Sequence, residues 1–152
     1  MKNLDMVKVR LVPDYKLHSD IHITSPSEAL ELLKEELSQH DREAVCVLNL
    51  NTAGKPINAS IIAIGDLASA TVHPRELFKC AILSSAAGII LIHNHPSGDL
   101  IPSNDDLQVT IRLISGGKLL GIRIIDHIIV GPGKQYYSMA EKDLIKKWRT
   151  RL

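Results

Sequence analysis

In the stretch Gly88-Ile89-Ile90-Leu91-Ile92-His93, a continuous apolar run ends at a histidine. Such a run is typical of a strand that is covered on both faces of a sheet. A loop containing proline and glycine follows, and a helix is expected from Asn104 to about Leu119. Open α/β sheets place their active sites where a strand meets a loop, so the sequence predicts a functional site just after this strand.

The rest of the chain alternates helices with strands. Ser25-Pro26-Ser27-Glu28 predicts a helix start, because it offers an N-cap serine, a proline in the first turn and a capping-box glutamate. Residues 44–50 and 57–64 predict a hairpin. The remaining expected elements are a strand over 7–11, a helix over 73–85, strands over 122–130 and 135–138, and a terminal helix over 139–148. This order predicts an α/β fold with a central mixed β-sheet flanked by helices.

The size and composition suit one globular domain. A chain of 152 residues with an apolar fraction of 45% can bury a sizeable core. We expect residues 1–20 to form an N-terminal strand extension and residues 21–152 to form the domain itself.

Charge and hydropathy limit the binding partners and the cellular compartment that we expect for this protein. A formal net charge of +1 gives no electrostatic reason to expect binding to nucleic acid or to an acidic membrane. No apolar run approaches the ~20 residues of a membrane-spanning helix, and Met1–Val12 lacks a signal-peptide core. Cys46 and Cys80 lie among apolar residues without CxxC spacing, so we expect reduced core thiols. We therefore expect a cytoplasmic protein.

His93 and His95 are candidate metal ligands. Side chains two apart on a strand share a face, so both imidazoles can point at one ion. Asp106, which the following loop brings back, is a natural third ligand. Catalytic zinc usually takes three such ligands and water. The alternative is that Ser103 and Asp106 only form the capping box of a helix, although helix capping and metal binding are compatible.

Three further residues are open between functional and structural roles. A hydrolytic zinc site needs a group that takes a proton from water, and Glu43, just before the strand over 44–50, is the candidate. Its alternative is an exposed residue at a strand end. Asp126 and His127 either orient a metal-binding histidine or satisfy backbone groups within a strand.

The motif His93-Asn94-His95-Pro96-Ser97-Gly98-Asp99, with Pro102-Ser103 and Asp106, resembles that of the JAMM (MPN+) metalloproteases. The surrounding sequence is similar to the bacterial RadC proteins over roughly residues 21–141. The supporting stretches are Thr71-Val72-His73-Pro74-Arg75-Glu76, residues 86–91, Leu120-Gly121-Ile122 and residues 126–131. The helix-hairpin-helix region that usually precedes this domain in RadC-like proteins is not seen in residues 1–20.

The resemblance implies a fold similar to that of cytidine deaminases and a zinc-dependent hydrolase of peptide or isopeptide bonds. It implies that His93, His95 and Asp106 ligate Zn²⁺ and that a peptide or protein is the substrate. It further implies that Glu43 is general base and then acid, and that Ser103 donates a hydrogen bond to the oxyanion.

Two other functions are compatible with the sequence. One is a protein associated with DNA repair or DNA processing, with a metal-dependent nuclease as one form of it. This function predicts strongly salt-dependent DNA binding, which the near-neutral charge does not support. The other is an interaction module that keeps the fold without catalysis. Such a module does not need all five of the residues His93, His95, Asp106, Glu43 and Ser103.

Overall fold

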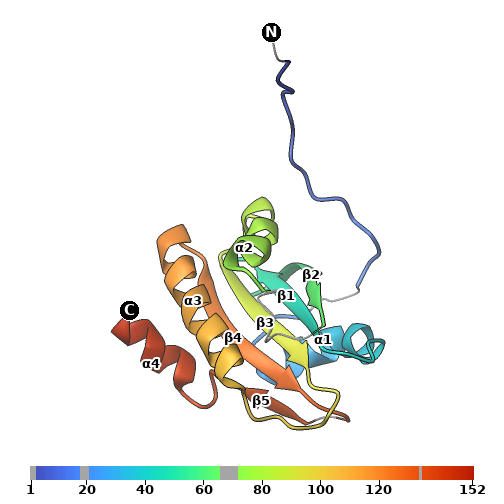
Figure 1. Cartoon of the computed structure of the whole chain (residues 1–152), viewed down its shortest axis with the longest axis vertical. Helices are drawn as coiled ribbons and strands as arrows, with labels where there is room; N and C mark the ends of the chain where they lie inside the picture. Colours follow the sequence, from blue (N-terminus) through green and yellow to red (C-terminus); the bar gives the residue numbers. More distant parts are fainter. Residues whose placement is uncertain (1–2, 18–20, 66–71, 134) are drawn as a thin grey trace.

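The computed structural model describes residues 3–17, 21–65, 72–133 and 135–152. At its centre lies a five-stranded sheet with the strand order β2-β1-β3-β4-β5 (Figure 1). The strands are β1 (Ala44–Leu50), β2 (Pro56–Ile64), β3 (Gly88–Asn94), β4 (Arg123–Val130) and β5 (Tyr136–Ser138). The helices are α1 (Pro26–Ser38), α2 (Pro74–Leu83), α3 (Asn104–Leu120) and α4 (Leu144–Arg151).

The sheet is mixed. Strand β3 pairs in parallel with β4, and the other neighbouring strands are antiparallel. A parallel pair needs a long crossover connection, which α3 supplies between β3 and β4. The carboxyl ends of β3 and β4 therefore lie at the same edge of the sheet. The expected α/β fold with a central mixed sheet and flanking helices is confirmed.

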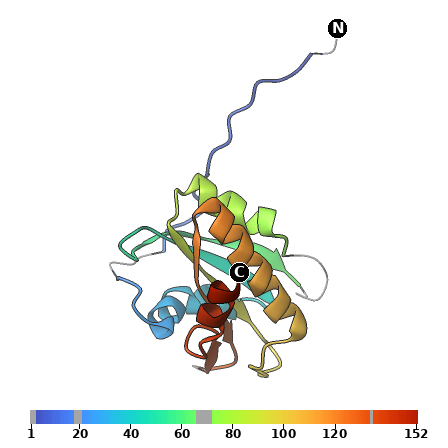
Figure 2. The same ribbon diagram turned by 90° about the vertical axis from the view of Figure 1, so that its left-hand side faces the viewer.

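Helices cover both faces of the sheet. Helix α1 packs on one face, where Leu33 belongs to the same buried cluster as Leu48 and Ile92. Helices α2, α3 and α4 cover the other face, where Leu113 of α3 lies in the cluster of Leu91 (Figure 2). Because β3 is covered on both sides, its residues are apolar throughout until His93.

The predicted start of α1 is confirmed in detail. The Ser25 side chain accepts the backbone N–H of Glu28, and the Glu28 carboxylate accepts the Ser25 N–H. Pro26 stands in the first turn, where its missing N–H costs nothing.

Two predicted elements differ from the structure. The strand over 7–11 is wrong, since residues 3–17 contain no strand or helix and Val7 and Val9 are exposed. An alternating pattern makes a strand only where a partner supplies the backbone ladder. The division into residues 1–20 and 21–152 stays a prediction. The terminal helix begins at Leu144 rather than Met139, because residues 139–143 form turns.

Other expectations concern the thiols and the membrane. Cys46 and Cys80 are both free cysteines, and Cys46 is buried. Burial raises the pKa of the Cys46 thiol to about 12, which keeps it protonated. Among the residues that the structure describes, no helix is long and apolar enough to cross a bilayer.

Candidate metal centre

Two neighbouring elements carry the candidate ligands. His93 is the last fully buried residue of β3, and His95 follows one residue beyond the end of that strand. The backbone N–H of His95 donates to the Val130 carbonyl of β4 at 2.7 Å, which extends the alignment of β3 past its end. Asp106 lies in the first turn of α3 and is 1% exposed. The parallel β3–α3–β4 unit thus gathers these residues at one edge of the sheet.

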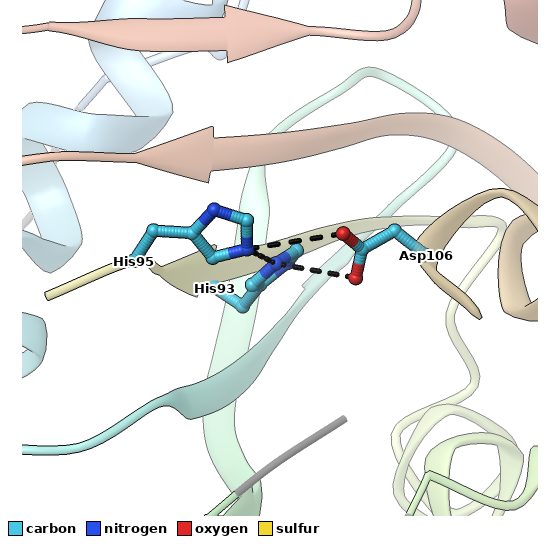
Figure 3. Close-up of side chains that lie close together, drawn as sticks. All are labelled: His93, His95 and Asp106. Carbon is cyan, nitrogen blue, oxygen red and sulfur yellow. Dashed lines mark hydrogen bonds and ion pairs between the residues drawn. The ribbon is translucent and has the colours of Figure 1, made fainter. Parts of the chain in front are cut away.

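The three side chains converge on one point (Figure 3). The two Nε2 atoms of His93 and His95 lie 2.8 Å apart. Asp106 Oδ1 lies 3.4 Å from His93 Nε2, and Asp106 Oδ2 lies 3.8 Å from His95 Nε2. One ligand atom from each residue falls within 4.8 Å of the others, so the cluster can hold a metal ion.

Asp106 combines helix capping with a place in this cluster. Its Oδ2 accepts the Ser103 N–H at 2.7 Å, while Ser103 Oγ accepts the Asp106 N–H at 3.1 Å. Its other oxygen, Oδ1, is buried and accepts no hydrogen bond within the described ranges. A buried carboxylate oxygen without a donor is costly, and a cation would satisfy it. Asp106 can therefore cap α3 with one carboxylate oxygen and face a metal ion with the other.

His95 presents a lone pair to the cluster. Its Nδ1 lies 2.5 Å from the backbone carbonyl of Asp99. Because a carbonyl can only accept, Nδ1 carries the proton, and neutral His95 has its lone pair on Nε2. The Asp99 side chain does not take part in this contact and instead accepts the Ile101 N–H at 3.0 Å within the same loop.

His93 is held neutral by its surroundings. Burial lowers its pKa well below the usual value, and the nearby rings of His127 and His95 lower it further. Its Nδ1 lies 2.8 Å from Nε2 of His127, whose own pKa burial lowers to about 3. Neutral imidazoles are the form of histidine that binds metals.

The donor set fits a divalent metal. Two imidazole nitrogens and a carboxylate oxygen are ligands that zinc accepts, and other first-row metals bind similar sets. The site meets two needs of such an ion. His93 is neutral and His95 turns a lone pair to the cluster, and one carboxylate oxygen of Asp106 accepts no hydrogen bond from the residues that the structure describes.

Glu43 stands at the rim of the same cluster. Its Oε1 lies 3.8 Å from His95 Nε2, and its side chain is 29% exposed against 11% for His95. Asn94 fixes the backbone around it, because its Oδ1 accepts the Ala44 N–H at 2.7 Å and its Nδ2 donates to the Arg42 carbonyl at 3.1 Å. The structure therefore brings all five predicted residues, His93, His95, Asp106, Glu43 and Ser103, to one edge of the sheet.

Asp126 and His127, which the sequence treats as a pair, have different roles in the structure. His127 contacts His93, whereas Asp126 accepts the Ser138 hydroxyl at 2.5 Å and the Ala140 N–H at 2.8 Å. Burial raises the pKa of Asp126 to about 6 despite these hydrogen bonds. Asp126 therefore ties down the turn after β5, away from the ligand cluster.

Three residues that support the candidate site are not assigned a role by the sequence alone. Asn94 was treated only as part of the motif, although its place between the two histidines turns it to the opposite face of β3. Thr110 lies one helical turn after Asp106, a spacing that could have indicated it. For His127 the sequence leaves two roles open, because its contact with His93 spans 34 residues and appears only in the structure.

A cavity of about 400 Å³ adjoins the ligand cluster. It lies between α1 and the β4–β5 hairpin, and its wall includes His95, Pro96, Leu37, Val130 and Tyr136. Its lining is largely apolar, with His95 at the side toward the cluster. The cavity is large enough for a substrate side chain beside the candidate metal centre.

Fold and site together define an α/β domain with a candidate metal centre at the carboxyl end of a buried strand. The chain belongs to the family of the RadC-like JAB domain, whose model matches residues 23–144. Among curated proteins, it is 47% identical over 131 residues to a UPF0758 protein of Clostridium acetobutylicum, covering 86% of this chain and 57% of that protein.

Other relatives show the same extent of similarity. A UPF0758 protein of Caldanaerobacter subterraneus is 48% identical over 79% of this chain and 51% of its own length. One of Methanosarcina mazei is 42% identical over 82% of this chain and 54% of its own length. The chain thus spans about half the length of the curated relatives it matches. The family model covers all the residues of the candidate site.

Proposed function

We propose that this domain is a zinc-dependent hydrolase of the JAB type that cleaves a peptide or isopeptide bond. His93, His95 and Asp106 would hold the zinc ion. The main support is the convergence of three potential ligand atoms. Asp106 also contributes a buried oxygen, Oδ1, that accepts no hydrogen bond from the described residues. When bound, zinc supplies a Lewis acid and lowers the pKa of water that it coordinates.

Glu43 is proposed to move the proton. Its carboxylate lies at the rim, within 3.8 Å of the ligand cluster and partly open to solvent. From there it can take a proton from the attacking water and give it to the departing amine. Asn94 supports this role because its side chain holds the backbone on both sides of Glu43 in place.

Ser103 is proposed to stabilise the charge that develops on the carbonyl oxygen. Its Oγ accepts the Asp106 N–H through a lone pair, which leaves the hydroxyl hydrogen able to donate to a substrate. Because the capping box fixes the Ser103 backbone, this donor is already oriented before substrate arrives. Preorganised donors of this kind often supply a large part of the rate enhancement in acyl transfer.

A peptide or protein substrate is supported by the adjoining cavity beside His95, whose wall exposes mostly apolar surface although polar residues also line it. The side chain of a residue next to the scissile bond can enter it. The formal net charge of +1 gives no comparable support to a nucleic-acid substrate.

The test is a comparison of new amino termini in a complex peptide mixture. The mixture is incubated with zinc-loaded wild-type protein or with zinc-loaded Glu43→Gln, and the amino groups released are labelled and identified. We expect the wild type to create a defined set of new termini and Glu43→Gln to create none while it retains its metal. Glutamine keeps the size of the side chain, so a difference between the two proteins reports the proton transfer.

Two outcomes would contradict the proposal. Equal cleavage by Glu43→Gln would remove Glu43 from the mechanism. No new termini with a wild-type protein that holds stoichiometric zinc would point instead to the non-catalytic interaction module.

A further inference from the structure

We propose that His127 and Thr110 form a directional hydrogen-bond relay that fixes the tautomer of His93 and connects it to Asp106. The role of this relay depends on the proposed metal centre, but its hydrogen bonds do not require a bound metal. It runs from α3 through β4 to β3, so one relay links the elements that carry two of the candidate ligands. His127 and Thr110 would thus be positioning residues rather than ligands.

The relay begins at the hydroxyl of Thr110. Its Oγ1 lies 2.6 Å from the backbone carbonyl of Asp106, and the hydroxyl donates there because a carbonyl only accepts. A hydroxyl has one hydrogen. The 2.6 Å contact between Thr110 Oγ1 and His127 Nδ1 must therefore have the histidine as donor.

This contact sets the tautomer of His127. Its ring is 0% exposed, and burial disfavours the charged imidazolium. A neutral ring with its hydrogen on Nδ1 has a lone pair on Nε2. His93 Nδ1, at 2.8 Å from that lone pair, is then the donor, and His93 keeps its own lone pair on Nε2.

The result is that the two histidines of the cluster present lone pairs by separate means. His93 does so through the relay and His95 through the Asp99 carbonyl. Both lone pairs face the Asp106 carboxylate, since His93 Nε2 lies 3.4 Å from Oδ1 and His95 Nε2 lies 3.8 Å from Oδ2. Among the described residues, Oδ1 has no hydrogen-bond donor. Three acceptors that face one another repel, and a cation at their centre turns this repulsion into attraction.

Reversal of the relay would close the site. If His127 carried its hydrogen on Nε2, it would donate to His93 Nδ1, and His93 would carry its hydrogen on Nε2. That N–H would point at Asp106 Oδ1, 3.4 Å away, and would occupy the position that a metal needs. The Thr110 hydroxyl opposes this state because its single hydrogen is already donated to the Asp106 carbonyl.

The alternative role for Thr110 and His127 is ordinary packing in the core. Thr110 Oγ1 also lies 3.5 Å from the Met139 sulfur, and both residues are fully buried. Packing alone requires shape and volume, whereas the relay requires the hydroxyl. Thr110→Val keeps the shape without the hydroxyl, and Thr110→Ser keeps the hydroxyl with one methyl fewer.

The experiment measures ring tautomers and metal affinity in the same three proteins. Long-range ¹H–¹⁵N NMR of metal-free wild type should show His93 and His127 with hydrogen on Nδ1, and Thr110→Ser should match it. In Thr110→Val both rings should shift toward hydrogen on Nε2. Affinity for Zn²⁺, measured by competition with a chromophoric chelator, should fall about 10- to 100-fold in Thr110→Val and stay within a few-fold of wild type in Thr110→Ser.

The outcomes separate the relay from the proposed enzyme activity. Hydrogen on Nε2 of His93 in wild type, or equal tautomers and zinc affinity in Thr110→Val, would overturn the relay whether or not the protein hydrolyses anything. Failure to find a substrate would leave both measurements unaffected. Circular dichroism of each variant checks the fold, and His127→Phe provides a second test, in which zinc affinity should fall by a similar factor if the fold is kept.

Discussion

Asp106 divides its two carboxylate oxygens between helix capping and the ligand cluster. Oδ2 accepts the Ser103 N–H at the start of α3, and Oδ1 faces His93 and finds no hydrogen-bond donor in the part of the chain that the structure describes. The residue that anchors the helix thus also keeps one buried carboxylate oxygen without a hydrogen-bond donor from the described residues. Stability and metal binding should therefore respond in opposite directions to a change at this residue.

Replacement of Asp106 by asparagine should separate these two roles. The amide oxygen can still accept the Ser103 N–H, and the amide N–H₂ can donate to the lone pair of His93 or His95. We expect metal-free Asp106→Asn to be more stable than metal-free wild type by about 1 kcal/mol, and to lose high-affinity zinc binding. Urea unfolding in the presence of a chelator measures the first effect.

Asp106→Ala is the control for the helix cap. It removes both the acceptor and the donor, and we expect it to be less stable than Asp106→Asn by about 1 kcal/mol. A metal-free Asp106→Asn that unfolds at lower urea than wild type would show that the Asp106 carboxylate is not strained in the cluster.

Asp126 should make the stability of the domain depend on pH. Its pKa is about 6 in the folded protein against a reference value of 3.8, because burial disfavours the anion. The folded state therefore binds the Asp126 proton more tightly than the unfolded state does. The stabilisation is complete below about pH 4 and is lost as the pH rises through about 6.

The variant Asp126→Asn measures this effect. Its amide oxygen can accept the His127 and Ala140 N–H groups, and its amide nitrogen can donate to Ser138 Oγ. From pH 4 to pH 7, the unfolding free energy of wild type should fall relative to that of Asp126→Asn by on the order of 2 kcal/mol. Chelator is kept in all samples, so that the pH dependence of metal binding does not contribute. Parallel curves would contradict the raised pKa.

At the scale of elements, the close approach of α3 to β4 depends on Gly117. A Cβ at this position would lie 2.2 Å from the Ile122 carbonyl oxygen, and the Ile122 N–H donates to the Gly117 carbonyl at 2.9 Å. The end of the helix therefore leads directly into the strand that carries His127. A side chain at residue 117 would push these two elements apart.

Gly117→Ala should destabilise the domain although alanine favours helix. The gain in helix propensity is about 1 kcal/mol, and the cost of forcing the backbone apart is about 1 to 3 kcal/mol or more. Because the contact is with a backbone atom that cannot turn aside, we expect a cost in the upper part of this range and a net loss of about 1 to 2 kcal/mol in chemical denaturation. Ser115→Ala, at an exposed position of the same helix, should be neutral or slightly stabilising. Equal stability of Gly117→Ala and wild type would contradict the tight contact.

The elements that the sequence predicted well are those whose own residues determine them. The apolar runs of β1 and β3 and the capping box of α1 gave nearly the observed bounds. The buried face of α3 also contains Asp106 and Thr110, polar residues that an apolar pattern does not indicate. The start of α4 was wrong because Asp126 holds the turn before it, a contact between residues far apart in the chain.

The sequence predicted the candidate ligands but not the groups that set their proton positions. Ligand types and spacing along one strand and helix indicated His93, His95 and Asp106, and the structure brings them together. The proton positions that prepare these ligands depend on His127 and on the Asp99 carbonyl, which local spacing does not reveal. Their roles come from the pairing of β3 with β4 and from the fold of the loop.

At the scale of the whole molecule, a bound metal would link α3 to the end of β3. Any ligand that binds the folded state alone stabilises it by mass action. Zinc at 100 times its dissociation constant should therefore raise the unfolding free energy of wild type by about 2.7 kcal/mol. Calorimetry with and without zinc measures this effect.

The variants assign that stabilisation to the proposed centre. Glu43→Gln should keep the zinc-dependent increase, because Glu43 is proposed as a base and not as a ligand. His95→Ala should lose it. An increase of the same size in His95→Ala would place the zinc elsewhere on the protein.

The metal centre is tested by the metal content of the purified, tag-free protein, measured by elemental mass spectrometry beside His95→Ala. We expect close to one zinc per chain in wild type and a loss of that zinc in the variant. A wild-type protein that takes up no stoichiometric metal even when zinc is supplied, or a His95→Ala variant that keeps it, would contradict the metal centre and the hydrolase built on it.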